Sequence, residues 1–259
     1  MWRSRARHRA ARNRQGEGRM SAALARPIPE SRRIRVRVWE LPVRIAHWLI
    51  VFSILVLAAT GFYIGHPFIS VPAPARDHFV MGTVKVIHFY AAIVFTLAVL
   101  SRILWMFMGN RYARWNQFIP TTRRRLHNLY ESLKFYLFIR RDPPPVIGHN
   151  ALAGAAYAVV YGICLVMIGT GLAMYAPQAP VGSPMRWFAF LIPFFGGLPT
   201  ARLIHHIGMW LLLAFMVHHV YSSILVSAIE HNGTIESIVS GNKFVEPETL
   251  AAQSEESDA

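Results

Sequence analysis

The segment Arg202–His219 reads R-L-I-H-H-I-G-M-W-L-L-L-A-F-M-V-H-H, and the spacing of its histidines decides the fold that the sequence predicts. Two residues 14 positions apart lie only about 40° apart around a helix axis, because each residue turns the helix by about 100°. His205 and His219 have this spacing. The other pairings between the two ends of the segment point about 120° or more apart. We therefore expect His205 and His219 to share one helix face, separated by about 21 Å along the axis.

The rest of the chain predicts that this helix is one of four that cross a membrane. Apolar residues make up 54% of the 259 residues and charged residues only 15%, against about 25% charged in soluble domains. Four apolar stretches reach the roughly 20 residues that a spanning helix needs, at about residues 45–64, 79–108, 151–176 and 203–229. The stretch Trp187–Ala201 is shorter and holds two prolines, so we expect it to fold back at the interface. The predicted fold class is all-α, a polytopic membrane protein built as a four-transmembrane-helix bundle.

The positive charge of the chain is uneven and predicts its orientation. The formal net charge is +14, and residues 1–44 hold thirteen Arg against three Glu. Residues 109–149 hold eight Lys or Arg against two acidic residues. Short basic segments stay on the cytoplasmic side of a membrane. We therefore expect both termini to be cytoplasmic, the protein to lie in the bacterial inner membrane, and the basic segments to meet the lipid bilayer rather than nucleic acid.

These patterns divide the chain into three parts. Residues 1–38 form a basic arm that is expected to be disordered, residues 39–244 form the four-helix domain, and residues 245–259 form an acidic tail. Between the second and third spans, apolar residues recur at helical spacing from Leu126 to Leu137. This repeat predicts an amphipathic helix that lies on the cytoplasmic surface of the membrane.

Histidines inside the spans are the candidate functional residues, because ionisable side chains are costly in a membrane. Depth pairs them. The fourth helix enters from outside, so His205 matches His88 near the outer end of the second helix, and His219 matches His47 on the inner side of the first. Each pair offers two imidazoles from different helices, and a porphyrin iron needs two axial ligands. The sequence therefore predicts two haem b groups with filled axial positions, whose remaining chemistry is one-electron transfer.

Two other interpretations stay open at this point. The four histidines could be polar side chains that only bridge helices in a structural membrane anchor. They could also serve a zinc or copper transporter, although such a site favours tighter clusters with carboxylates, and the four spans contain no Asp or Glu. The single cysteine excludes a disulfide scaffold and a cysteine-ligated iron–sulfur cluster.

Several segments of the four-helix domain resemble the b-type cytochrome subunits of membrane-bound nickel–iron hydrogenases. The first span, Arg44–Gly61 (R-I-A-H-W-L-I-V-F-S-I-L-V-L-A-A-T-G), and the segment Arg202–His219 are similar to the two long signatures of that family. Three shorter segments are similar to it as well: Val86–Tyr90 (V-I-H-F-Y), Asn110–Pro120 (N-R-Y-A-R-W-N-Q-F-I-P) and Glu230–Lys243 (E-H-N-G-T-I-E-S-I-V-S-G-N-K). The resemblance covers about residues 37–244 and leaves out the basic arm and the acidic tail.

The resemblance implies a function for the chain. Such a subunit anchors a periplasmic uptake hydrogenase, made of a large nickel–iron subunit and a small iron–sulfur subunit, and has no hydrogen chemistry of its own. Electrons pass from the small subunit to the outer haem at His88 and His205, then to the inner haem at His47 and His219, and then to a membrane quinone of the respiratory chain. Cytochrome b subunits of other respiratory dehydrogenases, such as formate dehydrogenase, share the fold and are the nearest alternative.

Overall fold

The computed structural model describes residues 33–68, 79–144 and 146–251. The chain divides into two compact units. One unit, Val36–Lys243, holds all the helices named below, and the other joins Met1–Arg35 to Phe244–Ala259. Most of the predicted basic arm and part of the acidic tail, residues 1–32 and 252–259, lie outside the described residues.

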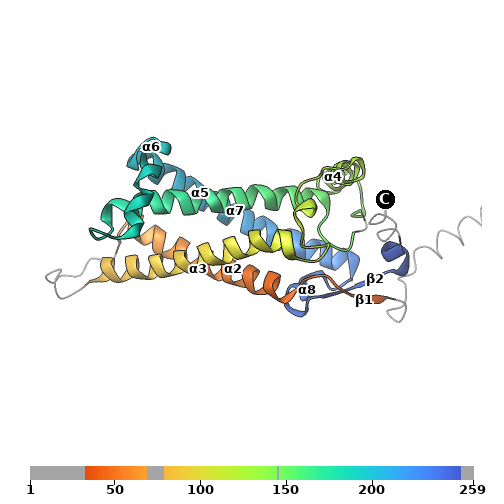
Figure 1. Cartoon of the computed structure of the whole chain (residues 1–259). Coiled ribbons are helices and arrows are strands. Elements are labelled where there is room, and N and C mark those ends of the chain that lie inside the picture. Colours follow the sequence, from red (N-terminus) through yellow and green to blue (C-terminus); the bar gives the residue numbers. More distant parts are fainter. Residues whose placement is uncertain (1–32, 69–78, 145, 252–259) are drawn as a thin grey trace, which may run out of the picture. The chain divides into compact units, whose positions relative to one another are not determined.

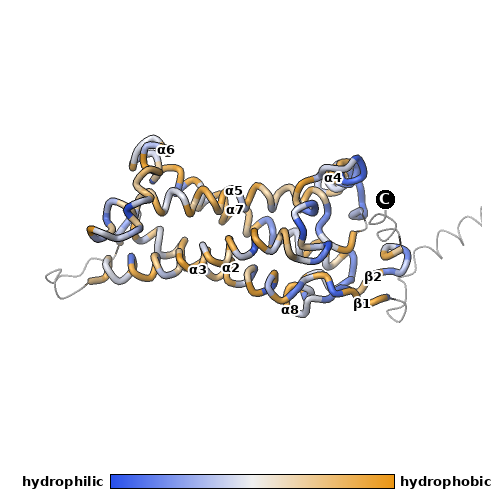
Figure 2. Tube along the Cα trace, viewed as in Figure 1, coloured by the Kyte–Doolittle hydropathy of each residue, from blue (hydrophilic) through white to orange (hydrophobic). Residues whose placement is uncertain are grey.

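Four helices of the described chain are long and apolar enough to cross a membrane, which confirms the number of spans that hydropathy predicts. Figure 2 shows their apolar character along most of their length. The full order of elements is β1 (Ile34–Arg37), α2 (Leu41–Gly65), α3 (Val80–Met108), η2 (Trp115–Gln117), α4 (Arg123–Tyr136), α5 (Ala151–Tyr175), η3 (Ala176–Gln178), η4 (Pro184–Phe190), α6 (Leu191–Phe194), α7 (Leu198–Glu230), α8 (Thr234–Ser240) and β2 (Asn242–Val245).

Two of the spanning helices begin earlier than the sequence predicts, and proline is the reason in both. Pro42 lies in the first turn of α2, and Pro199 in the first turn of α7. Proline is well accepted there, because the first helical N–H groups have no partner inside the helix. The stretch 187–201 is therefore only partly the folded-back segment that was expected. Its first part forms the short helices η4 and α6, and its last residues belong to α7.

The four long helices form two pairs. α2 packs along α3, and α5 packs along α7 (Figure 1). A buried apolar cluster joins the two pairs through Phe95 and Val99 of α3, Cys164 of α5 and Leu212 of α7. Leu212 lies midway along the sequence between His205 and His219. The apolar core of the bundle therefore separates the two levels at which the sequence places its paired histidines.

Polar residues fix where the helices of the basic connection begin. The Thr122 hydroxyl accepts a hydrogen bond from the backbone N–H of Arg125 at the start of α4. Asn150 caps α5 in the same way through Ala153, and Asn128 of α4 accepts from the first N–H of α5 at 2.8 Å. Such caps satisfy backbone groups that a helix end leaves unpaired. They confirm a helix in the amphipathic region and tie α4 to the start of α5, while its place on the membrane surface stays a prediction.

A compact turn around α8 holds the beginning of α2. The Trp39 indole donates to the Ser237 hydroxyl at 3.0 Å. The backbone N–H groups of Val38 and Trp39 donate to the carbonyl of Gly241 at 2.8 and 3.1 Å. Gly241 has a φ of +84°, and a Cβ there would lie 2.6 Å from the Trp39 carbonyl oxygen. Only glycine fits this position, because it alone combines a positive φ with so close an approach of backbone. We call this end of the bundle the α8 end, and the opposite end the α6 end.

The structure also contains a small sheet that the sequence analysis does not predict. β1 and β2, of four residues each, pair into a two-stranded sheet. The alternation of apolar and basic residues in Ile34–Arg37 has the period of a strand. Its arginines were counted instead as part of the basic arm. The fold is thus a helical bundle with one short ribbon.

Replacing Gly154 by alanine is expected to destabilise the bundle. A Cβ at Gly154 of α5 would collide with the backbone carbonyl of Gln117, whereas a Cβ at Gly162 of the same helix would meet nothing within 4 Å. Overpacking of this kind costs about 1–3 kcal/mol, and alanine otherwise favours a helix by about 1 kcal/mol over glycine. Thermal unfolding in detergent should show a lower midpoint for Gly154→Ala and an equal or higher one for Gly162→Ala. Equal midpoints for the two variants would contradict this packing.

Candidate functional site

The structure brings together His47 of α2 and His219 of α7 at the α8 end. The centroids of the two rings lie 6.3 Å apart, with 58° between the ring planes. A metal–imidazole bond is about 2 Å long, so two ligands of one metal place their nitrogens about 4 Å apart, and the ring radii add roughly 2 Å. The observed separation is compatible with two imidazoles that bind one metal between them.

The second pair, His88 of α3 and His205 of α7, lies at the α6 end. His88 lies close enough to His205 for a charge on one ring to act on the other. Two glycines lie against them: a Cβ at Gly61 of α2 would lie 3.5 Å from Cε1 of His88, and a Cβ at Gly171 of α5 would lie 3.6 Å from Cε1 of His205. The structure thus brings His47 near His219 and His88 near His205, each time joining α7 to a different helix of the other half, and the role of these pairs as haem ligands stays a prediction.

Hydroxyl groups from neighbouring helices hold three of these four rings. The Thr60 hydroxyl lies 2.8 Å from Nδ1 of His88, and the Thr170 hydroxyl lies 2.8 Å from Nδ1 of His205. The Tyr157 hydroxyl lies 3.2 Å from Nδ1 of His219. Nδ1 of His47 is the exception, because it is buried and has no hydrogen-bond partner among the described residues. In each of the three held rings, the nitrogen left over is Nε2.

The remaining two histidines of α7 are placed differently. Nδ1 of His206 lies 2.9 Å from the carbonyl of Arg202, and Nδ1 of His218 lies 3.4 Å from the Ser222 hydroxyl. Both partners belong to α7 itself, one turn away. These two rings are engaged within their own helix, whereas His205 and His219 are held by α5. The structure therefore separates the members of each His-His dipeptide in the way that the 14-residue spacing predicts.

The residues present fit a porphyrin better than a bare metal ion. Within the described residues, no group of three or more His, Cys, Asp or Glu side chains is placed to hold a metal. A bare ion such as zinc takes three or four protein ligands, whereas a porphyrin brings four nitrogens and needs only two from the protein. The two imidazole pairs, the glycines beside the α6-end pair and the buried Nδ1 of His47 all agree with haem.

A further histidine adjoins the α8-end pair. The ring of His149 lies 4.6 Å from that of Trp39 and 4.7 Å from that of Tyr157. Burial lowers the pKa of His149 well below its ordinary value, and the nearby cations Arg102 and Lys243 lower it further. His149 is therefore a neutral imidazole that packs behind Tyr157, the residue whose hydroxyl holds His219.

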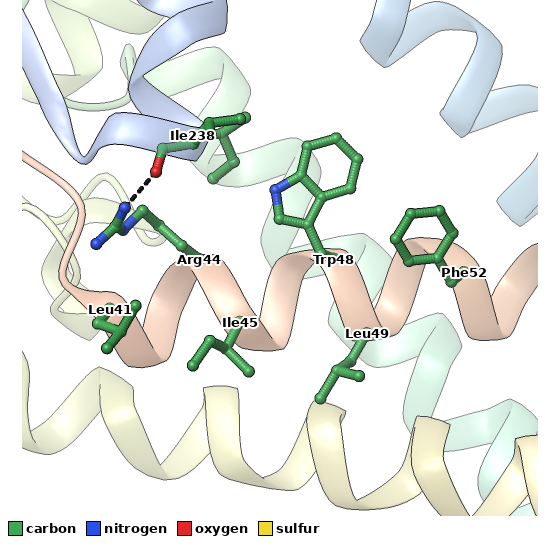
Figure 3. A pocket seen from close by; sticks show the side chains of 8 residues that line it. Leu41, Arg44, Ile45, Trp48, Leu49, Phe52 and Ile238 are labelled. Carbon is green, nitrogen blue, oxygen red and sulfur yellow. Dashed lines mark hydrogen bonds between the residues drawn. The ribbon is translucent and has the colours of Figure 1, made fainter.

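A shallow apolar groove of about 370 Å³ lies at the α8 end, and one of its lining residues, Trp48, has its ring 5.3 Å from that of His47. Arg44 reaches across it to donate a hydrogen bond to the carbonyl of Val239 near α8, and Trp48 and Phe52 follow along α2 (Figure 3). Arg44 Nε is buried without a hydrogen-bond partner among the described residues. The groove is thus an apolar surface with one cationic end.

The sequence analysis did not identify the three hydroxyl residues. One signal for two of them exists, because the dipeptide Thr-Gly occurs in both the first and the third spans, at Thr60-Gly61 and at Thr170-Gly171. In the structure each Thr-Gly lies against one histidine of the α6-end pair. Tyr157 has no comparable signal, since tyrosine is common in membrane helices.

Comparisons with known proteins agree with this architecture. The family described as prokaryotic cytochrome b561 matches residues 38–241. A probable Ni/Fe-hydrogenase B-type cytochrome subunit of Cupriavidus necator is 37% identical over 79% of this chain and 85% of its own length. The corresponding subunit of Bradyrhizobium diazoefficiens is 35% identical over 80% and 85%, and that of hydrogenase 1 of Escherichia coli K12 is 37% identical over 79% and 88%. The chain therefore belongs to the prokaryotic cytochrome b561 family, among the B-type cytochrome subunits of Ni/Fe-hydrogenases.

Proposed function

We propose that the chain is a diheme cytochrome b that passes electrons from a nickel–iron hydrogenase to membrane quinone. His88 and His205 would hold one haem b, and His47 and His219 the other. The observation that carries the proposal is the presence of two imidazole pairs at two levels of one bundle, each pair joining α7 to another helix. Haem, when bound, supplies an iron that gains or loses one electron.

The chain's own residues restrict this chemistry to electron transfer. A haem held by both imidazoles of a pair would have no iron position left for oxygen or hydrogen to bind. The apolar cluster around Phe95 and Leu212 lies between the two pairs and keeps water from the path. Along α7 the two levels are about 21 Å apart. The residues would thus divide the bilayer into short steps.

The distribution of charge supports the orientation that this proposal needs. Residues 109–149 are basic and connect α3 to α5 at the α8 end, so the positive-inside rule places that end in the cytoplasm. The α6 end then faces the periplasm of a bacterial inner membrane, and both termini are cytoplasmic. The relatives are named as hydrogenase cytochrome subunits. A small iron–sulfur subunit would therefore deliver electrons at His88 and His205, with the large nickel–iron subunit bound behind it.

The quinone acceptor would meet the chain at the α8 end. A quinone has a flat head with carbonyl oxygens that accept hydrogen bonds, and an apolar tail that stays in lipid. The groove offers apolar residues along α2 and the Arg44 guanidinium at one end (Figure 3). These features match both parts of a quinone, and Trp48 of the groove lies against the ring of His47.

Double substitutions test the pairing of the ligands. The pyridine haemochrome assay should find two protohaems per wild-type chain and one in each of His47→Ala, His88→Ala, His205→Ala and His219→Ala, because one axial ligand alone holds haem weakly. The double variant of His88 and His205 should still hold one haem, and that of His88 and His47 none. His206→Ala and His218→Ala are the matched controls and should keep two. Haem loss from the controls, or from both levels in the first double variant, would contradict the assignment.

Filling the groove tests the acceptor site. Ile45 lines the groove and is 50% exposed, and Leu55, outside it on the same helix, is 47% exposed. Reoxidation of the reduced cytochrome by a short-chain quinone should slow several-fold in Ile45→Trp, because the indole occupies the groove, and should be unchanged in Leu55→Trp. Equal rates in both variants, with intact haem spectra, would place the acceptor elsewhere.

Co-purification tests the partners. An affinity tag on this chain, in membranes solubilised with mild detergent from the native host, should bring down one iron–sulfur subunit and one nickel–iron subunit. Recovery of the catalytic subunit of another respiratory dehydrogenase, such as a formate-oxidising one, would replace the hydrogenase assignment and leave the haem ligation standing.

A further inference from the structure

The two threonines that hold the α6-end pair occupy matching positions in the two halves of the bundle. Thr60 on α2 lies 2.8 Å from Nδ1 of His88, and Thr170 on α5 lies 2.8 Å from Nδ1 of His205. Each threonine is followed by a glycine at which a Cβ would lie against the same ring. One half of the bundle thus repeats, on a different pair of helices, the arrangement of the other half.

The hydrogen bonds of these threonines decide which nitrogen of each ring carries the proton. The Thr60 hydroxyl also lies 2.6 Å from the carbonyl of Val56, and the Thr170 hydroxyl 2.8 Å from that of Val166. A hydroxyl has one hydrogen, and a carbonyl only accepts. The threonine therefore donates to the carbonyl and accepts from Nδ1–H of the histidine. Nε2 is left with its lone pair, which is the form of imidazole that binds a metal.

The α8-end pair lacks this support in part. His219 is held by the Tyr157 hydroxyl at the longer distance of 3.2 Å. Nδ1 of His47 is buried with no hydrogen-bond partner among the described residues. The two levels of the bundle therefore differ in how their rings are held: a hydroxyl holds both rings at the α6 end and only one ring at the α8 end.

We infer that Thr60 and Thr170 are positioning residues that set the order of the two reduction potentials. The inference rests on the haem ligation proposed above. An imidazole that donates its Nδ1–H to an oxygen becomes a stronger electron donor through Nε2, and such second-shell bonds tune a metal site. At the α6 end, two rings donate their Nδ1–H groups and stabilise the oxidised iron. At the α8 end only one ring does so, and the oxidised iron there is stabilised less. The α6-end site therefore has the lower potential.

This difference gives the electron a direction. One electron leaves the site at His88 and His205, which is oxidised, and enters the site at His47 and His219, which is reduced. No bond is formed or broken, and no proton is exchanged. The step runs downhill from the periplasmic side to the side of the quinone groove, and the two threonine hydroxyls contribute to this direction.

Redox titration of the purified cytochrome, followed by haem absorbance, tests this inference. Wild type should show two one-electron waves, the lower one lost in His88→Ala. Thr60→Val should shift the reduction equilibrium of the lower-potential site on the order of tenfold toward the reduced form. For one electron, this shift raises the lower potential by about 59 mV. The upper wave should stay in place. Thr60→Ser keeps the hydroxyl and should restore the wild-type value.

The control is Thr96→Val on α3, because Thr96 makes the same bond to a carbonyl one turn back, at 2.7 Å from Ala92, and holds no histidine. It should leave both waves unchanged. If Thr60→Val loses its haem, Thr170→Val is titrated instead, since it acts on the other ring of the same site. Unchanged potentials in the threonine variants, a shift of the upper wave, or assignment of the upper wave to His88 and His205 would overturn the inference. A wild-type chain without two haems would instead overturn the proposed function.

Discussion

An imidazole inside an apolar bundle needs a partner for each of its two ring nitrogens, and the positions of the helices depend on this requirement. Three of the four paired histidines place Nδ1 on a hydroxyl from a neighbouring helix. Because a polar group left unpaired inside a membrane is costly, these bonds fix the rotation of each ring and of the helix that carries it. The Nε2 atoms are then presented at two levels of the bundle, which is where two haem irons would be held.

The remaining features of the fold maintain those positions. The apolar cluster of Phe95, Val99, Cys164 and Leu212 lies between the two levels and sets the distance between them. At the α8 end, the Glu40 carboxylate accepts hydrogen bonds from the Trp105 indole and the Asn110 backbone, both at 2.9 Å. This contact ties the start of α2 to the end of α3. The depth of His47 relative to α7 thus depends on polar contacts outside the apolar core.

Sequence alone predicts the parts of this structure that depend on long-range patterns. Twenty or more apolar residues define a span whatever surrounds them, and a 14-residue spacing fixes a helix face, so the four helices and the shared face of His205 and His219 follow from the sequence. The pairing of His47 with His219 rests on their predicted depth. Helix starts were placed too late at Pro42 and Pro199, because hydropathy does not register that proline favours a first turn. The two short strands were missed because four residues carry too little pattern.

The hydroxyl partners could not be predicted with the same ease. Thr60, Thr170 and Tyr157 lie on helices other than those of the rings they hold, and only the rotation of α2 and α5 brings them into contact. The repeated Thr-Gly dipeptide is the one trace that they leave in the sequence, and it acquires meaning only beside the two histidines. Partners across a helix interface depend on packing angles, which a sequence pattern does not contain.

The central claim is that two irons are each held by two imidazoles in this one chain. Electron paramagnetic resonance of the oxidised, purified cytochrome tests it most directly, because two axial imidazoles give a low-spin ferric iron. The account predicts two low-spin ferric signals of equal integrated intensity per chain. A single low-spin signal, or a high-spin signal in the native protein, would contradict it.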